Sequence, residues 1–239
     1  MGVNPDELRG KLIFDAGCGS GAISIEMAKT FGMEVVAMDL AFGVELAYER
    51  NDSPYVHFIQ GSVLAPPFKE RMFDYLYSAG VLHHTNPDTQ KAFRAIVPTL
   101  KKDGRCFIWL YHPIDKKHHP HDWKKLYLYD LIRRKVTSRL PARVQFFLYL
   151  LLIPPFLLKQ RIFSLLGRKV NLLTWREKMQ GFFDSLSAVY VNRHTHEEVI
   201  EWFINEGFDN VEISDIGAYG FGTRGDLCKP GPERSQESL

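Results

Sequence analysis

The chain has 239 residues, of which 45% are hydrophobic and 24% are charged, and its formal net charge is +2. These values are ordinary for a globular protein with one large domain, or one domain with an insertion, and the net charge indicates no particular partner. The three cysteines lie far apart without a C-x-x-C pair, which argues against a disulfide framework or a zinc site and fits a reducing cytoplasm.

Strands alternate with helices up to residue 111. We expect strands over 11–16, 34–40, 56–61, 73–80 and 105–111, helices over 21–31, 42–50 and 89–100, and a turn over 101–104. In the first helix, Ile23, Met27 and Phe31 fall on one face. Such alternation implies parallel pairing through right-handed crossovers, so the sequence predicts an open α/β sheet. The polar start leads directly into the first strand, so no signal peptide is expected.

The alternation stops between His112 and about Asn192, where helices rich in Lys, Arg, Leu and Phe are expected. Between residues 112 and 190, 15 Lys and Arg side chains stand against 5 Asp and Glu side chains, a local excess of +10. The sequence therefore predicts a discontinuous α/β domain over 1–111 and 193–239, with a helical cap inserted over 112–192.

The α/β pattern resumes after the insertion. Thr195 and Glu198 have the spacing of a capping box at the start of a helix over 196–206, which Gly207 ends. Two final strands and a polar, disordered tail are expected over 211–217, 218–225 and 230–239.

Closely spaced glycines follow the first strand. Gly17, Gly19 and Gly21 form a G-x-G-x-G turn at the carboxyl end of a parallel strand, where ligands of open α/β sheets bind. Glycines there let the backbone approach a ligand and adopt positive φ. Gly17 and Gly19 with Ala22 also satisfy the loose dinucleotide fingerprint, so the turn alone leaves a nicotinamide cofactor open.

Acidic residues stand at the ends of the first two strands. A carboxylate at Asp15, two residues before Gly17, would repel a pyrophosphate at the helix N-terminus and would suit a ligand with an ammonium group. S-adenosylmethionine carries an ammonium group and a sulfonium but no phosphate. Asp39 is placed to accept hydrogen bonds from ribose hydroxyls, which it would do for either cofactor. Asp15 therefore favours S-adenosylmethionine.

Five stretches in their order resemble the class I S-adenosylmethionine-dependent methyltransferases, in the broad small-molecule group called methyltransferase type 11. They are DAGCGSG at 15–21, VVAMDL at 35–40, FIQGSVLAPPF at 58–68, FDYLYSAGVLHHTNP at 73–87 and LKKDGRCFIW at 100–109. The resemblance covers about residues 11–111, and a weaker resemblance extends over 194–224. It implies a Rossmann-like, mostly parallel sheet with an antiparallel last strand.

The resemblance also implies a set of cofactor-binding residues. The positions implied near the methionine portion, the ribose and the adenine are Asp15, Gly17, Cys18 (through its backbone), Gly19, Asp39, Leu40, Ser78, Gly80 and His84. Where the family carries an Asp for the adenine amino group, this chain has Ser62, whose hydroxyl can accept that bond without a charge. Val63 is then expected to pack on the adenine ring.

His83 and His84 follow the fourth strand and are expected to face the methyl group. Alignment supplies most of the rate of an in-line methyl transfer, and a base helps only when the acceptor atom carries a proton. An imidazole titrates near neutral pH and suits that role. The alternative is that one ring only packs under the loop. Both histidines are candidate catalytic residues.

Further candidates lie on the expected acceptor side. Tyr111 and His112 end the fifth strand. The resemblance implies that the chain returns to the domain beside the active site, with Tyr190, Arg193 and His194 lining the acceptor side. The alternative is that these three residues only pack against the last helix and hold it in place.

No metal ion is expected. Histidines recur after residue 111, at positions 112, 118, 119 and 121. No carboxylate or cysteine completes a recognised ligand spacing among them.

The insertion contains an apolar run, 144–158, with basic residues on both sides. These fifteen residues, interrupted by Pro154 and Pro155, fall short of the roughly 20 needed to span a bilayer, so no transmembrane helix is expected. Two interpretations stay open for the helices over 133–169. They form a lid over the cofactor or a dimer contact, or they rest on an anionic membrane and admit a lipid-like acceptor. The pattern of a nucleic-acid-binding module is absent from the sequence.

The sequence therefore predicts a cytoplasmic methyltransferase that uses S-adenosylmethionine, acts on a small or amphipathic acceptor and releases S-adenosylhomocysteine. Peripheral contact with the inner membrane face is an additional expectation. A nicotinamide-dependent oxidoreductase and a non-catalytic cofactor-binding module are the alternatives. Asp15 disfavours the first, and Ser62 leaves the second open.

Overall fold

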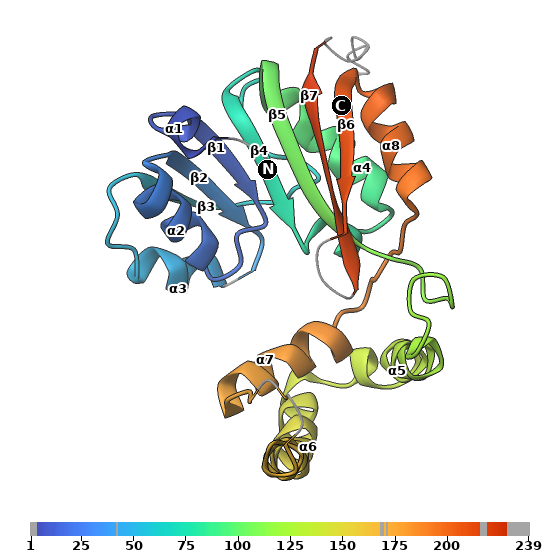
Figure 1. The fold of residues 1–239 in the computed structure, drawn as a ribbon. Coiled ribbons are helices and arrows are strands. Elements are labelled where there is room, and N and C mark those ends of the chain that lie inside the picture. Colours follow the sequence, from blue (N-terminus) through green and yellow to red (C-terminus); the bar gives the residue numbers. More distant parts are fainter. Residues whose placement is uncertain (1–3, 42, 168–169, 171, 216–218, 229–239) are drawn as a thin grey trace. The chain divides into compact units, whose positions relative to one another are not determined.

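The computed structural model describes residues 4–41, 43–167, 170, 172–215 and 219–228. The chain divides into two compact units, Met1–Pro113 with Asn192–Leu239, and Ile114–Val191. The first unit holds a sheet and its covering helices, and the second is helical (Figure 1). The expected tail lies outside the described residues, as do residues 216–218 in the region of the last two expected strands.

The first unit is built on a seven-stranded sheet (Figure 1). Across the sheet, the strands are β3 (Val56–Gln60), β2 (Glu34–Asp39), β1 (Leu12–Ala16), β4 (Phe73–Ala79), β5 (Leu100–Tyr111), β7 (Gly220–Leu227) and β6 (Phe208–Ser214). The first five strands of the chain pair in parallel, whereas β7 is antiparallel to both β5 and β6. The predicted mostly parallel sheet with an antiparallel last strand is confirmed.

Helices cover both faces of the sheet because its central strands are apolar on both sides. Along β1, Ile13 packs into one core with Ala28, whereas Phe14 packs into the other core with Phe93 and Phe203. Ala28 belongs to α2 (Ala22–Phe31), and the two phenylalanines belong to α4 (Thr89–Ile96) and α8 (His196–Asn205). Other helical segments described in this unit are α1 (Pro5–Leu8), α3 (Gly43–Glu49) and the 3-10 turns Leu82–His84 and Val97–Thr99.

The turn expected over 101–104 is wrong, because these residues lie inside β5. Phe73 pairs with Leu100 and Tyr75 pairs with Arg105, so the residues between them on β5 form a bulge. Asp103 adopts a positive φ of 63° there. The turn-forming sequence therefore marks an irregularity within a longer strand.

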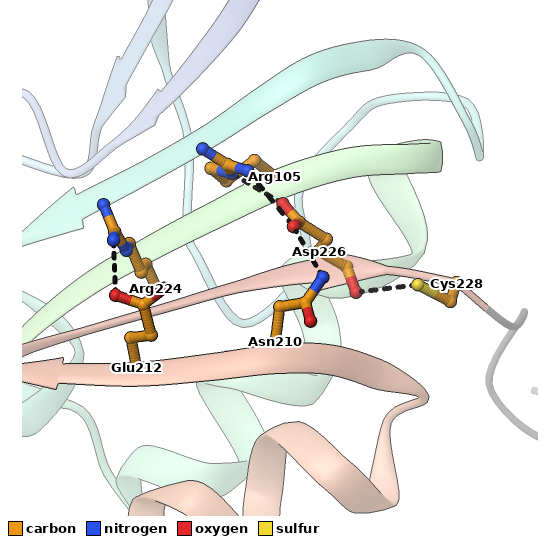
Figure 2. Close-up of polar contacts among 6 residues, drawn as sticks. All are labelled: Arg105, Asn210, Glu212, Arg224, Asp226 and Cys228. Atoms are coloured by element: carbon orange, nitrogen blue, oxygen red, sulfur yellow. Dashed lines mark hydrogen bonds and ion pairs between the residues drawn. The ribbon is translucent and has the colours of Figure 1, made fainter. Parts of the chain in front are cut away.

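Charged side chains join the antiparallel edge of the sheet (Figure 2). Arg105 on β5 donates to both carboxylate oxygens of Asp226 on β7, with Nε–Oδ1 at 2.6 Å and Nη2–Oδ2 at 3.1 Å. Asn210 on β6 donates to the same carboxylate at 3.4 Å, and Arg224 on β7 pairs with Glu212 on β6. These contacts tie β7 to both of its neighbours.

A charged hollow of about 260 Å³ lies at the amino ends of β1, β4 and β5. Two ion pairs lie in it: Lys101 contacts Asp74 at 2.9 Å, and Arg105 contacts Asp226. Ligands of open parallel sheets bind at the carboxyl ends of the strands. This hollow is therefore not the expected cofactor site.

The second unit contains α5 (Trp123–Lys135), the 3-10 turn Thr137–Arg139, α6 (Ala142–Leu165) and α7 (Trp175–Leu186). Tyr149 of α6 is fully buried and packs against Phe182 and Phe183 of α7. Its hydroxyl lies 3.1 Å from the Ser187 hydroxyl. Tyr149 therefore anchors α6 on α7.

The expected interruption of the apolar run at Pro154 and Pro155 is wrong, because α6 continues through both residues. Both prolines are exposed, so the carbonyl groups that lose a helical donor can bind water. The helix has 24 residues, and an 18-residue window within it has a mean hydropathy of 1.5, which makes it long and apolar enough to cross a membrane by length and composition alone. The segment is therefore not too short to span a bilayer, contrary to the expectation from the sequence.

Candidate cofactor and active site

The glycine turn joins the carboxyl end of β1 to that of β2. The N–H groups of Gly17 and Cys18 donate to the Met38 carbonyl at 2.8 and 3.0 Å. The Gly19 N–H donates to Asp39 Oδ2 at 2.8 Å. Three successive amides therefore point toward the end of β2. In a phosphate-binding turn the amides point at the ligand instead.

Gly17 and Gly19 have different surroundings. Gly17 adopts a φ of 98°, and a Cβ built on it would lie 2.3 Å from a methyl group of Val81. A Cβ on Gly19 would meet no atom within 4 Å. Gly17 therefore lets the turn approach the loop after β4, and Gly19 borders open space where a ligand can approach.

Asp15 lies below this turn and is only 2% exposed. The Ser24 hydroxyl of α2 donates to its Oδ2 at 2.6 Å. Burial raises the pKa of Asp15 to about 6, the Ser24 hydrogen bond opposes this shift, and the charge of Asp39 adds to it. An opposite charge nearby would restore the ionised form, so this carboxyl group favours a cationic ligand.

The same contact corrects the expected orientation of α2. Ser24 is fully buried, whereas Ile23, expected on one face with Met27 and Phe31, is 51% exposed. Because the Ser24 hydroxyl serves the buried Asp15, a polar side chain occupies the inner face of the helix.

Cys18 contributes through its main chain. Burial, with the charges of Asp15 and Asp39, raises the pKa of the Cys18 thiol to about 12. The thiol therefore stays protonated at neutral pH and is not a nucleophile.

The ribose and adenine candidates lie at the ends of β2 and β3. Asp39 is half-buried, and Leu40 beside it is 69% exposed, which offers an apolar surface to a base. The Ser62 hydroxyl accepts the Leu64 N–H at 3.2 Å. Val63 is buried in the core, so little of its side chain is left to pack on a ring.

The candidates at the end of β4 support the backbone. Ser78 is buried, and its hydroxyl donates to the Ala16 carbonyl at 2.6 Å. Gly80 adopts a φ of 76°, and its N–H donates to the Trp109 carbonyl at 3.3 Å. Ser78 therefore bridges β4 to β1, and Gly80 links the end of β4 to β5.

His83 and His84 lie in one 3-10 turn and differ in exposure. His83 is fully buried, with its ring centroid 4.3 Å from that of His84 and 4.1 Å from that of Tyr111. Neither ring nitrogen of His83 has a hydrogen-bond partner among the described residues. Burial, with the charges of His84, His194 and Arg193, lowers the pKa of His83 well below its usual value. His83 is therefore neutral at neutral pH. Of the two histidines, only the half-buried His84 exposes part of its side chain.

Asn192 connects the segment after the insertion to the histidine loop. Its N–H donates to the His83 carbonyl at 2.8 Å, and its Nδ2 donates to the Thr85 carbonyl at 3.2 Å. No motif marks this residue in the sequence, because its partners lie more than 100 positions away.

Arg193 packs on the end of β5. Its guanidinium carbon lies 5.4 Å from the centre of the Tyr111 ring, and its Nη1 donates to the His112 carbonyl at 3.0 Å. Tyr111, His112 and Arg193 are therefore brought together next to His83. Tyr190 belongs to the second unit and is exposed.

His194 lies between α4 and α8. It is buried, with Nε2 2.7 Å from Thr89 Oγ1 and Nδ1 3.1 Å from Glu198 Oε1. The Glu198 N–H still donates to the Thr195 hydroxyl, but its carboxylate contacts His194, so the expected reciprocal capping box is not formed between these described residues. These contacts favour the interpretation that His194 seats the last helix.

The strand order, the glycine turn after β1 and the acid at the end of β2 are the features expected of the class I S-adenosylmethionine-dependent methyltransferases. A solved SAM-dependent methyltransferase from Methanosarcina mazei has the same fold, with a TM-score of 0.58 and 16% identity over 94% of each chain.

Sequence comparison supports the same class. Residues 13–104 match the family model described as "Methyltransferase domain". Phosphoethanolamine N-methyltransferase 2 of Caenorhabditis elegans is 33% identical over 107 residues, 43% of this chain and 24% of the relative. Sterol 24-C-methyltransferase of Saccharomyces cerevisiae is 27% identical over 113 residues, 45% of this chain and 29% of the relative. The match therefore spans roughly a quarter of the length of these relatives, and residues 13–104 of this chain are similar to a methyltransferase domain.

Proposed function

We propose that the protein transfers a methyl group from S-adenosylmethionine to a small or amphipathic acceptor and releases S-adenosylhomocysteine. The observation that carries this proposal is the buried Asp15 below a turn whose amides point toward β2. An ammonium group stabilises such a carboxylate, and a pyrophosphate destabilises it. Asp39 offers an acceptor for ribose hydroxyls, and Leu40 offers an apolar surface for adenine.

The protein's own contribution to the reaction is mainly alignment. The bound cofactor supplies a methyl group on a sulfonium, whose sulfur keeps the electron pair of the breaking bond. The side chains must hold the acceptor in line and, where the acceptor atom carries a proton, remove that proton. The candidates for contacting the acceptor are the half-buried His84, Tyr111 and Arg193. That His83 or His84 acts as the base stays a prediction.

A thermal-shift titration with S-adenosylhomocysteine and NAD tests the cofactor. We expect the Tm to rise with S-adenosylhomocysteine and not with NAD, because a ligand that binds only the native state stabilises it. Stabilisation by NAD alone would overturn the proposal in favour of an oxidoreductase. Stabilisation by S-adenosylhomocysteine without methyl transfer to any acceptor in a panel would indicate a non-catalytic module.

The acceptor class is inferred from α6 and from the names of the two relatives, which refer to phosphoethanolamine and a sterol. Large apolar side chains are exposed on α6, namely Phe146, Phe147, Leu151, Leu152, Leu158 and Ile162. Exposed basic side chains on and before the helix are Arg134, Lys135, Arg139, Arg143, Lys159 and Arg161. An apolar helix with basic neighbours fits an anionic membrane surface. We propose that the second unit docks on the cytoplasmic face of a membrane, where an amphipathic acceptor is available.

Vesicle binding tests this surface. The chain is expected to co-sediment with vesicles that contain anionic phospholipid at low salt, and added salt should weaken the binding because it screens the basic groups. Leu151→Glu should reduce the bound fraction, since Leu151 is 75% exposed on α6. Leu46→Glu, at an exposed position of α3, is the matched control and should bind like the wild type. A wild-type chain that does not bind at low salt would overturn the membrane contact.

A further inference from the structure

Three potential metal ligands converge in the first unit. His112 directly follows β5, His196 is the first residue of α8, and Asp215 directly follows β6. We propose that these three side chains bind a divalent transition-metal ion of the zinc class. The site goes beyond the proposed methyl transfer, for which the sequence names only His112 of the three, as an acceptor-side candidate.

The geometry fits a small ion. His112 Nε2 lies 3.4 Å from Asp215 Oδ1, and His196 Nε2 lies 3.2 Å from the same oxygen. One ligand atom from each residue lies within 4.8 Å of the other two. Zinc bonds of about 2.0–2.2 Å in a tetrahedral site place ligand atoms roughly 3.3–3.5 Å apart. Small side-chain adjustments are therefore enough to bring all three atoms onto one ion.

Aromatic packing holds the two imidazoles. Phe221 on β7 stacks on His112, with ring centroids 4.9 Å apart and an interplanar angle of 28°. The His196 ring meets the same phenyl ring edge-on at 4.5 Å. The main-chain N–H of His112 also donates to the Tyr219 carbonyl at 3.0 Å. Two ligands are thus fixed before an ion binds, which favours a specific site.

The donor set selects the kind of ion. Two imidazole nitrogens and one carboxylate oxygen suit Zn²⁺ and similar divalent ions, whereas Mg²⁺ and Ca²⁺ prefer oxygen ligands. The Asp215 side chain is 67% exposed, so the fourth coordination position is open to water. An ion here would link the end of β5, the start of α8 and the residue after β6.

Hydrogen bonds from two histidines to one carboxylate would give similar distances without an ion. The Asp215→Asn variant distinguishes the two arrangements. Its amide oxygen can still accept a hydrogen bond from an imidazole, but it carries no charge and is a weak ligand for Zn²⁺. Because the side chain is exposed, the substitution should leave the fold intact.

The test is a calorimetric Zn²⁺ titration of the tag-free, chelator-treated protein. We expect one Zn²⁺ per chain and a Tm that rises with Zn²⁺ but not with Mg²⁺. Co²⁺ bound in place of Zn²⁺ should show the visible absorption of a nitrogen- and oxygen-ligated ion. Asp215→Asn and His196→Gln should each weaken Zn²⁺ binding by more than the roughly 10- to 100-fold that loss of an outer-shell partner causes.

Two further variants complete the design. Asp215→His keeps a ligand at this position and should retain Zn²⁺ binding. His57→Gln is the matched control, because His57 is a half-exposed histidine on β3 that contacts Glu34 at 3.0 Å, and its loss should leave the affinity unchanged. Circular dichroism without metal shows whether each variant is folded. Equal Zn²⁺ affinity in the wild type and folded Asp215→Asn, or no saturable binding by the wild type, would overturn the site.

Discussion

At about pH 7.5, the Asp15→Asn variant is expected to be more stable than the wild type and to bind S-adenosylhomocysteine about 100-fold more weakly. Burial raises the pKa of Asp15 to about 6 from 3.8, so the ionised form is disfavoured in the fold by about 3 kcal/mol. Asparagine keeps an oxygen that accepts from the Ser24 hydroxyl, but its buried amide N–H offsets part of the gain. The expected net increase in the free energy of unfolding is therefore about 1–2 kcal/mol. Urea unfolding measures it.

The same pKa sets a pH dependence of stability. Between 3.8 and about 6, the folded chain holds the Asp15 proton while the unfolded chain has lost it. The free energy of unfolding therefore falls as pH rises through this window, and the penalty is complete above it. The Asp15→Asn variant lacks this contribution. The difference in the free energy of unfolding between this variant and the wild type should therefore grow from pH 3.8 to about 6 and stay constant at higher pH.

Cofactor binding should lower the pKa of Asp15, because an ammonium partner favours the carboxylate. Near pH 6, binding of S-adenosylhomocysteine should therefore release protons, which calorimetry in buffers of different ionisation enthalpy detects. Asp52→Asn is the control, since Asp52 is an exposed acid that pairs with Lys29 at 2.8 Å, and it should bind like the wild type. Unchanged affinity in Asp15→Asn would contradict the assigned role of this carboxylate.

The fold was largely predictable because apolar periodicity reports which segments are buried. Strands β1 to β5 are largely apolar runs, and helices separate all of them but β3 and β4, which favours parallel pairing. The errors lie where turn-forming residues occur inside an element. The bulge at 101–104 sits within β5, and α6 continues through Pro154 and Pro155. In both places the surrounding structure overrides the local preference of the residues.

The candidate residues are easiest to name from the sequence where one short segment carries them. Asp15 and Gly17 share one turn, so the sequence alone names them. The unequal burial of His83 and His84, and the approach of His196 and Asp215 to His112, depend on contacts between distant parts of the chain. Local spacing cannot encode such contacts, which is why the sequence indicated no metal site.

The Gly17→Ala substitution is expected to reduce the free energy of unfolding by about 2–4 kcal/mol. Gly17 has a φ of 98°, where a residue with a Cβ is strained. The new Cβ would also lie 2.3 and 2.5 Å from the two Val81 methyl groups and 2.7 Å from the Val81 Cβ. Rotation of the valine cannot relieve a contact with all three atoms, so the turn or the loop after β4 must shift. Urea unfolding measures the loss.

A double-mutant cycle separates the clash from the strain. Val81→Ala removes both methyl groups and with them most of the clash. The loss in the free energy of unfolding of the double variant should therefore be about 1–2 kcal/mol smaller than the sum of the losses of the two single variants. Gly19→Ala is the matched control, with a φ of 54° and no atom within 4 Å, and should cost only about 1–2 kcal/mol of backbone strain. A cycle without coupling would contradict the predicted clash. Coupling of the expected size would show that the turn above Asp15 and the loop that carries His83 and His84 are packed as one unit, so that a shift in either displaces the other.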